Sequence, residues 1–482
     1  MSGSSTGPAT AGELGQSSVQ VRPRGAEEWL FRTLILVVAL APLPLGSNRP
    51  LPAALLALAA GLLLALWGGL AHFGRLRVSV PLSRIAWPAA LYALACLWIV
   101  MQWVPAAPNI LADPIWAEAS RLLGTELPQR ISVNPEATVT GLMHLLTYAA
   151  TFWLALQLAR DEDRARRGIH AVAIIGCAYA LYGLVVYLSG NEWILIYRKW
   201  SYADSLTSTF VNRNSFATFA GLCLLCAVHL LLARTRHLLG LNRPARIKAA
   251  LLIEELTVRS GWVTMAVLAL SIALVLTASR AGVMSSMAGL LCLAGAHLSR
   301  RSTSAAQMTL VAAILAAIVA TSFATSGELL AKRSRLDDVD NSFADRNQTY
   351  ALTLDAIRAT PWTGTGFGTF ADVFPAYRND DRPQVTWDKA HNTYLENALE
   401  LGIPAALALG LSIALLVLRA AKGIRERRRG KALPAIGFAA GIIVGLHSLV
   451  DFSLQIPAVS VLFAFLLGLA VSQSWPRSAA RG

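Results

Sequence analysis

The residues best suited to catalysis lie in one polar stretch of a largely apolar chain. Asp388 precedes His391 by three residues, and Tyr394 follows it by three. The periodicity over 387–401 predicts a helix closed by Gly402, on which these three side chains would share a face. A carboxylate so placed can orient an imidazole, which titrates near neutral pH and can act as a general base. The alternative is a surface histidine beside a surface acid.

Three arginines add groups that can bind an anion. Arg280 lies in the tight turn 279–282 (Ser-Arg-Ala-Gly) between two apolar stretches, and Arg213 lies in the segment 210–214 (Phe-Val-Asn-Arg-Asn). Arg346 is near the start of a helix predicted over 343–359. A charge at the tip of an apolar hairpin is costly unless it extends to water or binds a ligand. Guanidinium groups grip phosphate oxygens in pairs, so both interpretations stay open for Arg213 and Arg280.

A glycine-rich segment, 364–368 (Gly-Thr-Gly-Phe-Gly), lies between the two predicted helices. A dinucleotide cradle is excluded, because it needs a preceding strand and a βαβ setting. The remaining alternatives are a turn whose backbone amides approach a phosphate, as at Gly366, or simply a tight turn. The five cysteines all lie in apolar runs, and the pair Cys223 and Cys226 has no second pair at metal-binding spacing, so no metal site or cofactor is expected.

Composition determines the class of protein in which these groups operate. The chain has 482 residues, of which 55% are hydrophobic and 15% charged, and its mean hydropathy is +0.52. This composition indicates an integral membrane protein rather than a soluble one. The net charge of +14 resides in short clusters between apolar runs without interleaved aromatic residues, which excludes nucleic acid as the expected partner.

The apolar windows predict an all-α fold with about 12 transmembrane helices. Their ranges are 29–46, 51–71, 85–105, 138–159, 169–189, 214–233, 261–279, 281–298, 307–325, 403–420, 434–450 and 458–474.

The distribution of Lys and Arg gives the expected topology, because cytoplasmic loops are enriched in positive charge. Both termini are predicted to be cytoplasmic, with one large, partly helical periplasmic loop. The expected organisation is a disordered cytoplasmic tail at 1–27, helices one to nine within 28–325, the catalytic loop at 326–402, helices ten to twelve within 403–475 and a cytoplasmic tail at 476–482.

The order of these motifs resembles that of the O-antigen ligase and polymerase superfamily, over roughly residues 200–460. The motifs that match are 210–214, the turn 279–282, Arg346, the glycine-rich segment 364–368, and His391-Asn392 with Gly402. Ala405, three residues beyond Gly402, departs from the Gly, Thr or Tyr that the ligase pattern favours at this position, which keeps the polymerase alternative open.

The resemblance implies a multi-pass glycosyltransferase of the bacterial inner membrane that acts at its periplasmic face. Its donor would be a glycan linked to undecaprenyl diphosphate, and a ligase would use a sugar of lipid A core as acceptor. Arg280, Arg346 and His391 would be catalytic. The groups expected to contact substrate are Arg213, Asn392, Tyr394, Gly366 and Asp388.

The expected mechanism is metal-independent and inverting, with arginines binding the diphosphate and His391 removing a proton from the acceptor hydroxyl. The alternatives in the same superfamily are a polysaccharide polymerase and a protein O-oligosaccharyltransferase. The alternative in a different class is a multispan transporter or flippase. Transporters place ionisable groups in mid-span and often contain two similar halves, whereas here the polar groups gather toward one face.

Overall fold

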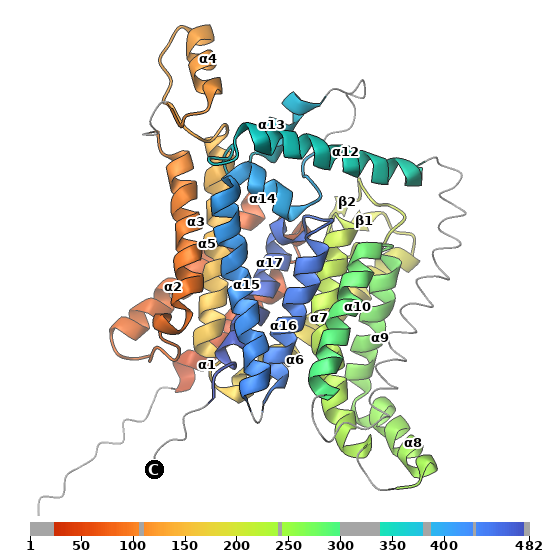
Figure 1. Ribbon diagram of the computed structural model, residues 1–482. Helices are drawn as coiled ribbons and strands as arrows, with labels where there is room; N and C mark the ends of the chain where they lie inside the picture. Colours follow the sequence, from red (N-terminus) through yellow and green to blue (C-terminus); the bar gives the residue numbers. More distant parts are fainter. Residues whose placement is uncertain are drawn as a thin grey trace, which may run out of the picture.

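The computed structural model describes residues 24–105, 110–239, 243–298, 338–378, 387–427 and 430–476, and confirms the all-α class (Figure 1). The helices are α1 (Arg24–Leu40), α2 (Pro50–His72), α3 (Ala86–Trp103), α4 (Pro114–Leu123), α5 (Pro135–Leu158), α6 (Glu162–Leu188), α7 (Arg213–Leu239), α8 (Ala245–Glu254), α9 (Gly261–Leu276), α10 (Arg280–Leu298), α12 (Asp338–Ala359), α13 (Phe370–Val373), α14 (Thr393–Leu401), α15 (Ile403–Glu426), α16 (Ala432–His447) and α17 (Pro457–Ser472). The strands β1 (Trp193–Ile194) and β2 (Tyr197–Arg198) form a short antiparallel hairpin.

Six described segments are long and apolar enough to cross a membrane. They are α2, Leu82–Trp103, α5, α6, Arg213–Thr235 and α15. A seventh crossing would be the pair Arg246–Arg259 and Gly261–Leu276, which is bent by 84°. Eleven of the twelve predicted apolar stretches coincide with a helix, but α10, α16 and α17 are shorter apolar helices and the stretch 307–325 lies outside the described residues. The described residues therefore support a membrane protein, and they do not confirm the predicted number of twelve spans.

Helix α17 forms the centre of the bundle. Every residue from Pro457 to Ser472 is buried, as expected for a helix that is apolar on all sides. It packs closely against α5, where a Cβ atom added to Gly468 would lie 2.6 Å from the carbonyl oxygen of Phe152. Its start, Ile456, packs beside Gly46, whereas the carbonyl of Ser472 at its end accepts a hydrogen bond from Arg160.

Small residues set the register between α7 and α10. A Cβ atom added to Gly282 of α10 would lie 2.5 Å from the Cβ of Ala217 in α7, and four residues further along Gly221 of α7 faces Ser286 of α10. Two contacts that advance in the same direction show that these helices run parallel. Their first residues therefore lie at the same end of the bundle.

Helix α16 packs against the same pair in the opposite direction. Its last residue, His447, forms a hydrogen bond with Thr218 near the start of α7, whereas Ile443 lies beside Gly221 one turn further along. The C-terminus of α16 therefore reaches the end of the bundle where α7 and α10 begin.

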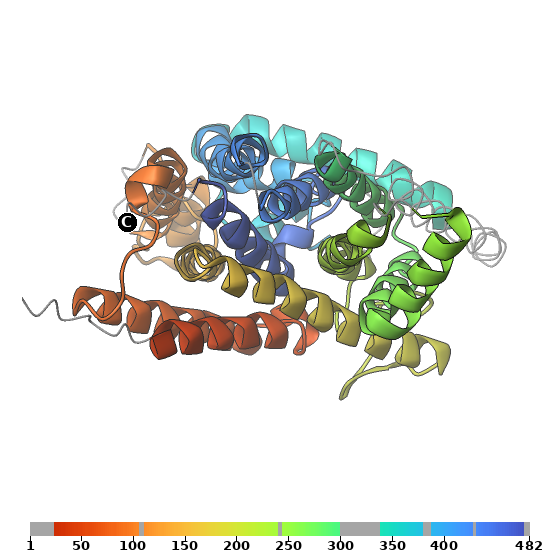
Figure 2. The same cartoon turned by 90° about the horizontal axis from the view of Figure 1, so that it is seen from below.

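Helices α12 and α14 lie across this end of the bundle (Figure 1). Figure 2, seen from below, shows α12 running along one edge behind the green and blue helices. Helix α12 ends at Ala359, before Pro361, as the sequence predicts. The structure begins α12 at Asp338, five residues earlier than the predicted range.

The predicted helix over 387–401 is wrong at its start. Helix α14 begins at Thr393, because the Asn392 side chain caps it by accepting hydrogen bonds from the backbone N–H groups of Tyr394 and Leu395. His391 has a φ of +53°, which no helix allows. Asp388 and His391 therefore lie ahead of the helix, and the shared helix face expected for Asp388, His391 and Tyr394 does not exist.

Candidate functional site

Two helices at this end of the bundle begin at an arginine. Asn212 caps α7 by accepting hydrogen bonds from the N–H groups of Asn214 and Ser215, so Arg213 is the first residue of that helix. Ser279 caps α10 through the N–H of Gly282, with Arg280 as the first helical residue. Caps of this kind satisfy free amides, and helix starts carry a partial positive charge. The arrangement directs positive charge toward one end of the bundle.

Asp451 joins these helices. Its Oδ1 atom accepts a hydrogen bond of 3.0 Å from Asn214 Nδ2 at the start of α7. Its backbone carbonyl accepts one of 2.9 Å from Thr393 Oγ1 at the start of α14, and Oδ2 accepts from Ser453. Because Asp451 is fully buried, these contacts fix the carboxylate between the two helix starts.

The same carboxylate faces His391. The Nδ1 atom of His391 lies 4.0 Å from Asp451 Oδ1 and is buried without a hydrogen-bond partner in the described residues. The ring packs edge-on against Trp387 and Phe452, and 18% of the side chain remains exposed. Burial lowers the pKa of His391 to about 4, with Asp451 opposing this change and Arg346 adding to it. The imidazole is therefore neutral at pH 7 and can accept a proton.

Helix α12 brings Arg346 to this group. Tyr350 donates a hydrogen bond of 3.0 Å from its hydroxyl to the backbone carbonyl of His391. Arg346 precedes Tyr350 by four residues and so lies on the same face of α12. It is close enough that its charge contributes to the lowered pKa of His391. The structure thus brings together His391 and Arg346, as predicted.

The other two arginines differ in how they are held. Arg213 donates a hydrogen bond of 3.3 Å to Ser205 Oγ and stacks over the ring of Tyr202. Arg280 is exposed, and within the described part of the chain it forms no hydrogen bond or ion pair. The parallel register of α7 and α10 places both residues at the His391 end of the bundle.

Three charged residues that the sequence did not assign to the site lie in the loop and helix that carry His391. Glu396 is fully buried, with one carboxylate oxygen 3.3 Å from Lys389 Nζ and the other accepting a hydrogen bond of 2.8 Å from the N–H of Ala390. Glu400 is also buried and accepts a hydrogen bond of 3.0 Å from the N–H of Phe370. Burial, followed by the charge of Glu396, raises the pKa of Glu400 to about 8. Their spacing of four residues places both carboxylates on one face of a helix, but this spacing alone does not predict that they are buried.

The glycine-rich segment is a tight turn rather than a phosphate cradle. The N–H of Gly366 already donates to the carbonyl of Glu400, and the N–H of Phe367 donates to Gln102. The φ of Gly366 is +106°, and a Cβ atom there would overlap Ser132. The prediction that Gly366 binds substrate is therefore replaced by a packing role, because its amide is occupied and its α-carbon is covered.

Three further residues that were predicted to contact substrate have other contacts or positions in the structure. The side-chain oxygen of Asn392 is engaged in capping α14, and the hydroxyl of Tyr394 donates to the carbonyl of Gly445. Asp388 is exposed, and the carboxylate beside His391 belongs to Asp451 instead. The reason is that Asp388 precedes the helix, so its distance from His391 is not set by helical spacing.

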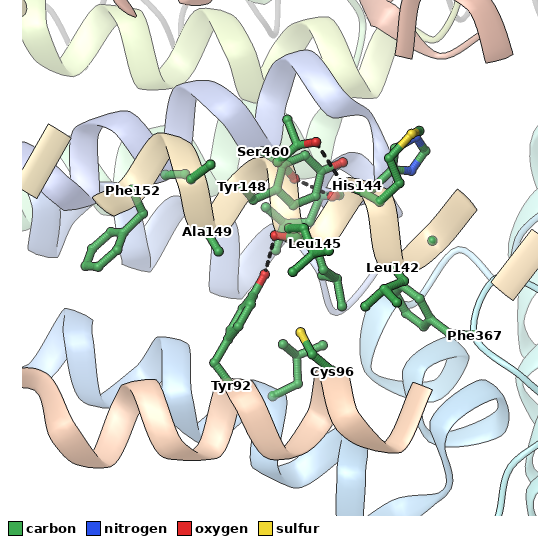
Figure 3. Close-up of a pocket in the computed structure, with 18 of the residues that line it drawn as sticks. Tyr92, Cys96, Leu142, His144, Leu145, Tyr148, Ala149, Phe152, Phe367 and Ser460 are labelled. Carbon is green, nitrogen blue, oxygen red and sulfur yellow. Dashed lines mark hydrogen bonds between the residues drawn. The ribbon is translucent and has the colours of Figure 1, made fainter. Parts of the chain in front are cut away.

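A long cavity of about 1530 Å³ reaches the site from within the bundle. Its walls come mainly from α3, α5, α15 and α17, and Figure 3 shows Tyr92 of α3 donating to the carbonyl of Leu145 in α5 across it. Most of the lining is apolar, including Leu142 and Phe152. Lys389 and Thr393 line it as well, so it extends to the loop that carries His391.

Among the described residues, no group of three or more His, Cys, Asp or Glu side chains has a geometry that could hold a metal ion.

Comparison with known proteins confirms the resemblance stated from the sequence. Residues 265–410 match a family model described as O-antigen ligase. The matched range contains Arg280, Arg346 and His391, whereas Arg213 and Asp451 lie outside it. No curated protein matches the chain.

Proposed function

We propose that this protein is a glycosyltransferase that moves an assembled polysaccharide from undecaprenyl diphosphate to a sugar hydroxyl of lipid A core, as an O-antigen ligase. The family match supports the enzyme class, because it spans the helix hairpin and the loop that carry the charged residues. The reaction would take place at the periplasmic face of the bacterial inner membrane, with both termini in the cytoplasm.

The observation that carries this proposal is that three arginines lie at the same end of the bundle as one neutral histidine. Arg213 and Arg280 begin two parallel helices, and Arg346 reaches the same end from α12. Breaking a sugar–diphosphate bond leaves negative charge on a phosphate oxygen. Preorganised guanidinium groups and helix starts stabilise such charge without having to reorganise during the reaction.

His391 would act as the general base. In the direct displacement that we propose, the acceptor hydroxyl attacks the anomeric carbon, its proton passes to His391, and the diphosphate leaves with the bonding electrons, which inverts the anomeric centre. Asp451 faces Nδ1 of His391 at 4.0 Å, so it would stabilise the imidazolium that forms. Binding of the diphosphate would also neutralise Arg346 and raise the pKa of His391 from its low value in the free protein.

The cavity supports a lipid-linked substrate. Its apolar walls suit hydrocarbon, and its polar end is formed by Lys389 and Thr393 beside the His391 loop. A lipid chain in this space would place the attached polar group beside the loop that carries His391.

A polysaccharide polymerase or a protein O-oligosaccharyltransferase would use the same groups with a different acceptor. Lipopolysaccharide gels of a deletion strain, with and without complementation, separate these alternatives. The deletion strain is expected to lose the whole ladder and to accumulate lipid-linked glycan. The wild-type gene should restore the ladder, and the His391→Ala variant should not. A ladder reduced to single-repeat capping would instead indicate a polymerase, and restoration by His391→Ala would contradict the base assignment.

A further inference from the structure

We propose that Glu396 is a positioning residue for His391, which it holds through the backbone of Ala390 and the side chain of Lys389. This role rests on the proposed function, in which His391 is the base. Glu396 has no contact with the imidazole ring in the described structure, so it would act only through the chain that carries the histidine.

The contacts of Glu396 support a clamp on the residues just ahead of His391. One carboxylate oxygen accepts a hydrogen bond of 2.8 Å from the N–H of Ala390, and the other lies 3.3 Å from Lys389 Nζ. Glu396 and Ala390 are both fully buried. A buried carboxylate that holds two successive residues, Lys389 and Ala390, also fixes the direction of the chain at the next residue, His391. Breaking these contacts would leave the buried charge of Glu396 unpaired, which is costly.

The backbone at His391 needs such a restraint. Its φ of +53° is unfavourable for a residue with a Cβ atom, by about 1–2 kcal/mol. Three groups keep it there: Glu396 before it, the Tyr350 hydroxyl at its own carbonyl, and the carbonyl of Ser448, which accepts from the N–H of Thr393 after it. Of these, the Glu396 contact is charge-assisted and fully buried, so it provides the strongest restraint.

Glu400 preserves the pairing of Glu396 with Lys389. It lies one turn along α14 and accepts from the N–H of Phe370, so it connects the clamp to the glycine-rich turn. With a pKa near 8, Glu400 holds a proton at neutral pH. The single positive charge of Lys389 is then shared with one carboxylate, that of Glu396.

The groups that face His391 come from several elements. Asp451 and Phe452 face it from the segment before α17, Arg346 and Tyr350 from α12, and Trp387 from its own loop. Loosening the clamp would let the ring leave these neighbours. Its exposure would then rise, and its pKa would return toward the ordinary value near 6.5.

The test is the variant Glu396→Gln, which keeps the shape of the side chain. A glutamine has one acceptor oxygen and an NH₂ group that donates, so it can serve Ala390 but repels Lys389. Purified full-length protein is treated with diethyl pyrocarbonate over pH 4–8, and modification of His391 is measured by peptide mass spectrometry relative to the exposed His72. This readout does not depend on glycan transfer. The matched control is Glu118→Gln, which replaces a carboxylate of an exposed pair on α4.

We expect Glu396→Gln to raise the modification rate of His391 at least threefold and to move its pH midpoint toward 6.5, with no change in Glu118→Gln. Where glycan transfer is measurable, kcat should fall by about 10- to 100-fold with the donor KM within twofold of wild type. A rate and midpoint equal to those of wild type would overturn the positioning role, even if the variant had lower thermal stability. If the wild-type protein transfers no glycan, the proposed function fails while the modification result still decides the role of Glu396.

Discussion

Replacing Asp451 by Asn removes one charge from the site while preserving its shape. Asp451 is fully buried, and its carboxylate oxygens accept hydrogen bonds from Asn214 and Ser453. The amide oxygen of an asparagine can still accept one of these. The principal loss is therefore the negative charge that lies 4.0 Å from Nδ1 of His391.

The size of the effect follows from that distance. Two unit charges 4 Å apart interact by about 4 kcal/mol at an effective dielectric constant of about 20. This interaction exists only after His391 has gained a proton, so its loss destabilises the transition state more than the resting site. Since about 1.4 kcal/mol corresponds to a tenfold change in rate, and solvent and relaxation reduce the full value, kcat should fall by about 100- to 1000-fold.

The direction of the pH effect gives a second test. Asp451 raises the pKa of His391 against the effects of burial and Arg346, which together bring it to about 4. Removing the carboxylate disfavours the protonated imidazole, so this pKa falls further. The acid limb of kcat/KM should therefore move to lower pH while the plateau drops.

The assay is transfer of glycan from lipid-linked donor to purified core acceptor between pH 3 and 8, a range that extends below the pKa of His391. The matched control is Asp355→Asn on α12, which alters an exposed ion pair with Arg358 and should leave kcat within twofold of wild type. An Asp451→Asn enzyme with wild-type kcat, or one whose acid limb moves to higher pH, would refute the imidazolium role of Asp451.

Three further results are expected. Arg280→Lys should lower kcat/KM for the donor by about 10- to 100-fold, because an ammonium group cannot make the paired contacts of a guanidinium. Normal kinetics would argue against diphosphate binding at Arg280, and Arg121→Lys on α4 serves as the control. Gly366→Ala should destabilise the protein by about 2–4 kcal/mol in thermal unfolding, since a methyl group at φ +106° would overlap Ser132. The control Gly61→Ala, where a methyl group meets only open space, should not destabilise the protein in this way. Equal stability of the two variants would contradict the packing role of Gly366. Transfer activity should survive thorough chelation, and a strict requirement for added metal ion would exclude the metal-independent mechanism.

Much of the fold was predictable because helix boundaries depend on local signals. Apolar windows located eleven helices, and the caps Asn212 and Ser279 place Arg213 and Arg280 at the first helical position. The contact between α7 and α10 was not predictable, since it depends on small residues meeting across two chain segments. The prediction that Arg280, Arg346 and His391 share one site came from the family resemblance instead.

The carboxylates of the site show where sequence reasoning failed. The sequence points to Asp388 because it lies three residues from His391, but that spacing brings two side chains together only inside a helix. The cap at Asn392 starts α14 after both residues, and a residue 60 positions further along the chain, Asp451, supplies the nearby charge. The burial of Glu396 and Glu400 could not be predicted, because charged residues alone give no sign that they are buried.

The contact between α7 and α10 through Gly282, Ala217 and Gly221 also limits how this protein can change over evolutionary time. Because these residues have little or no side chain, the separation of the two helix starts depends on backbone contact and on nothing that a second mutation could easily restore. Substitutions on the exposed side of α10, at Met284 and Leu291, leave that separation untouched, whereas α7 is almost entirely buried. Sequence drift should therefore be fast on that side of α10 and nearly absent along the narrow line where the two helices touch, even though that line contains no residue that meets substrate.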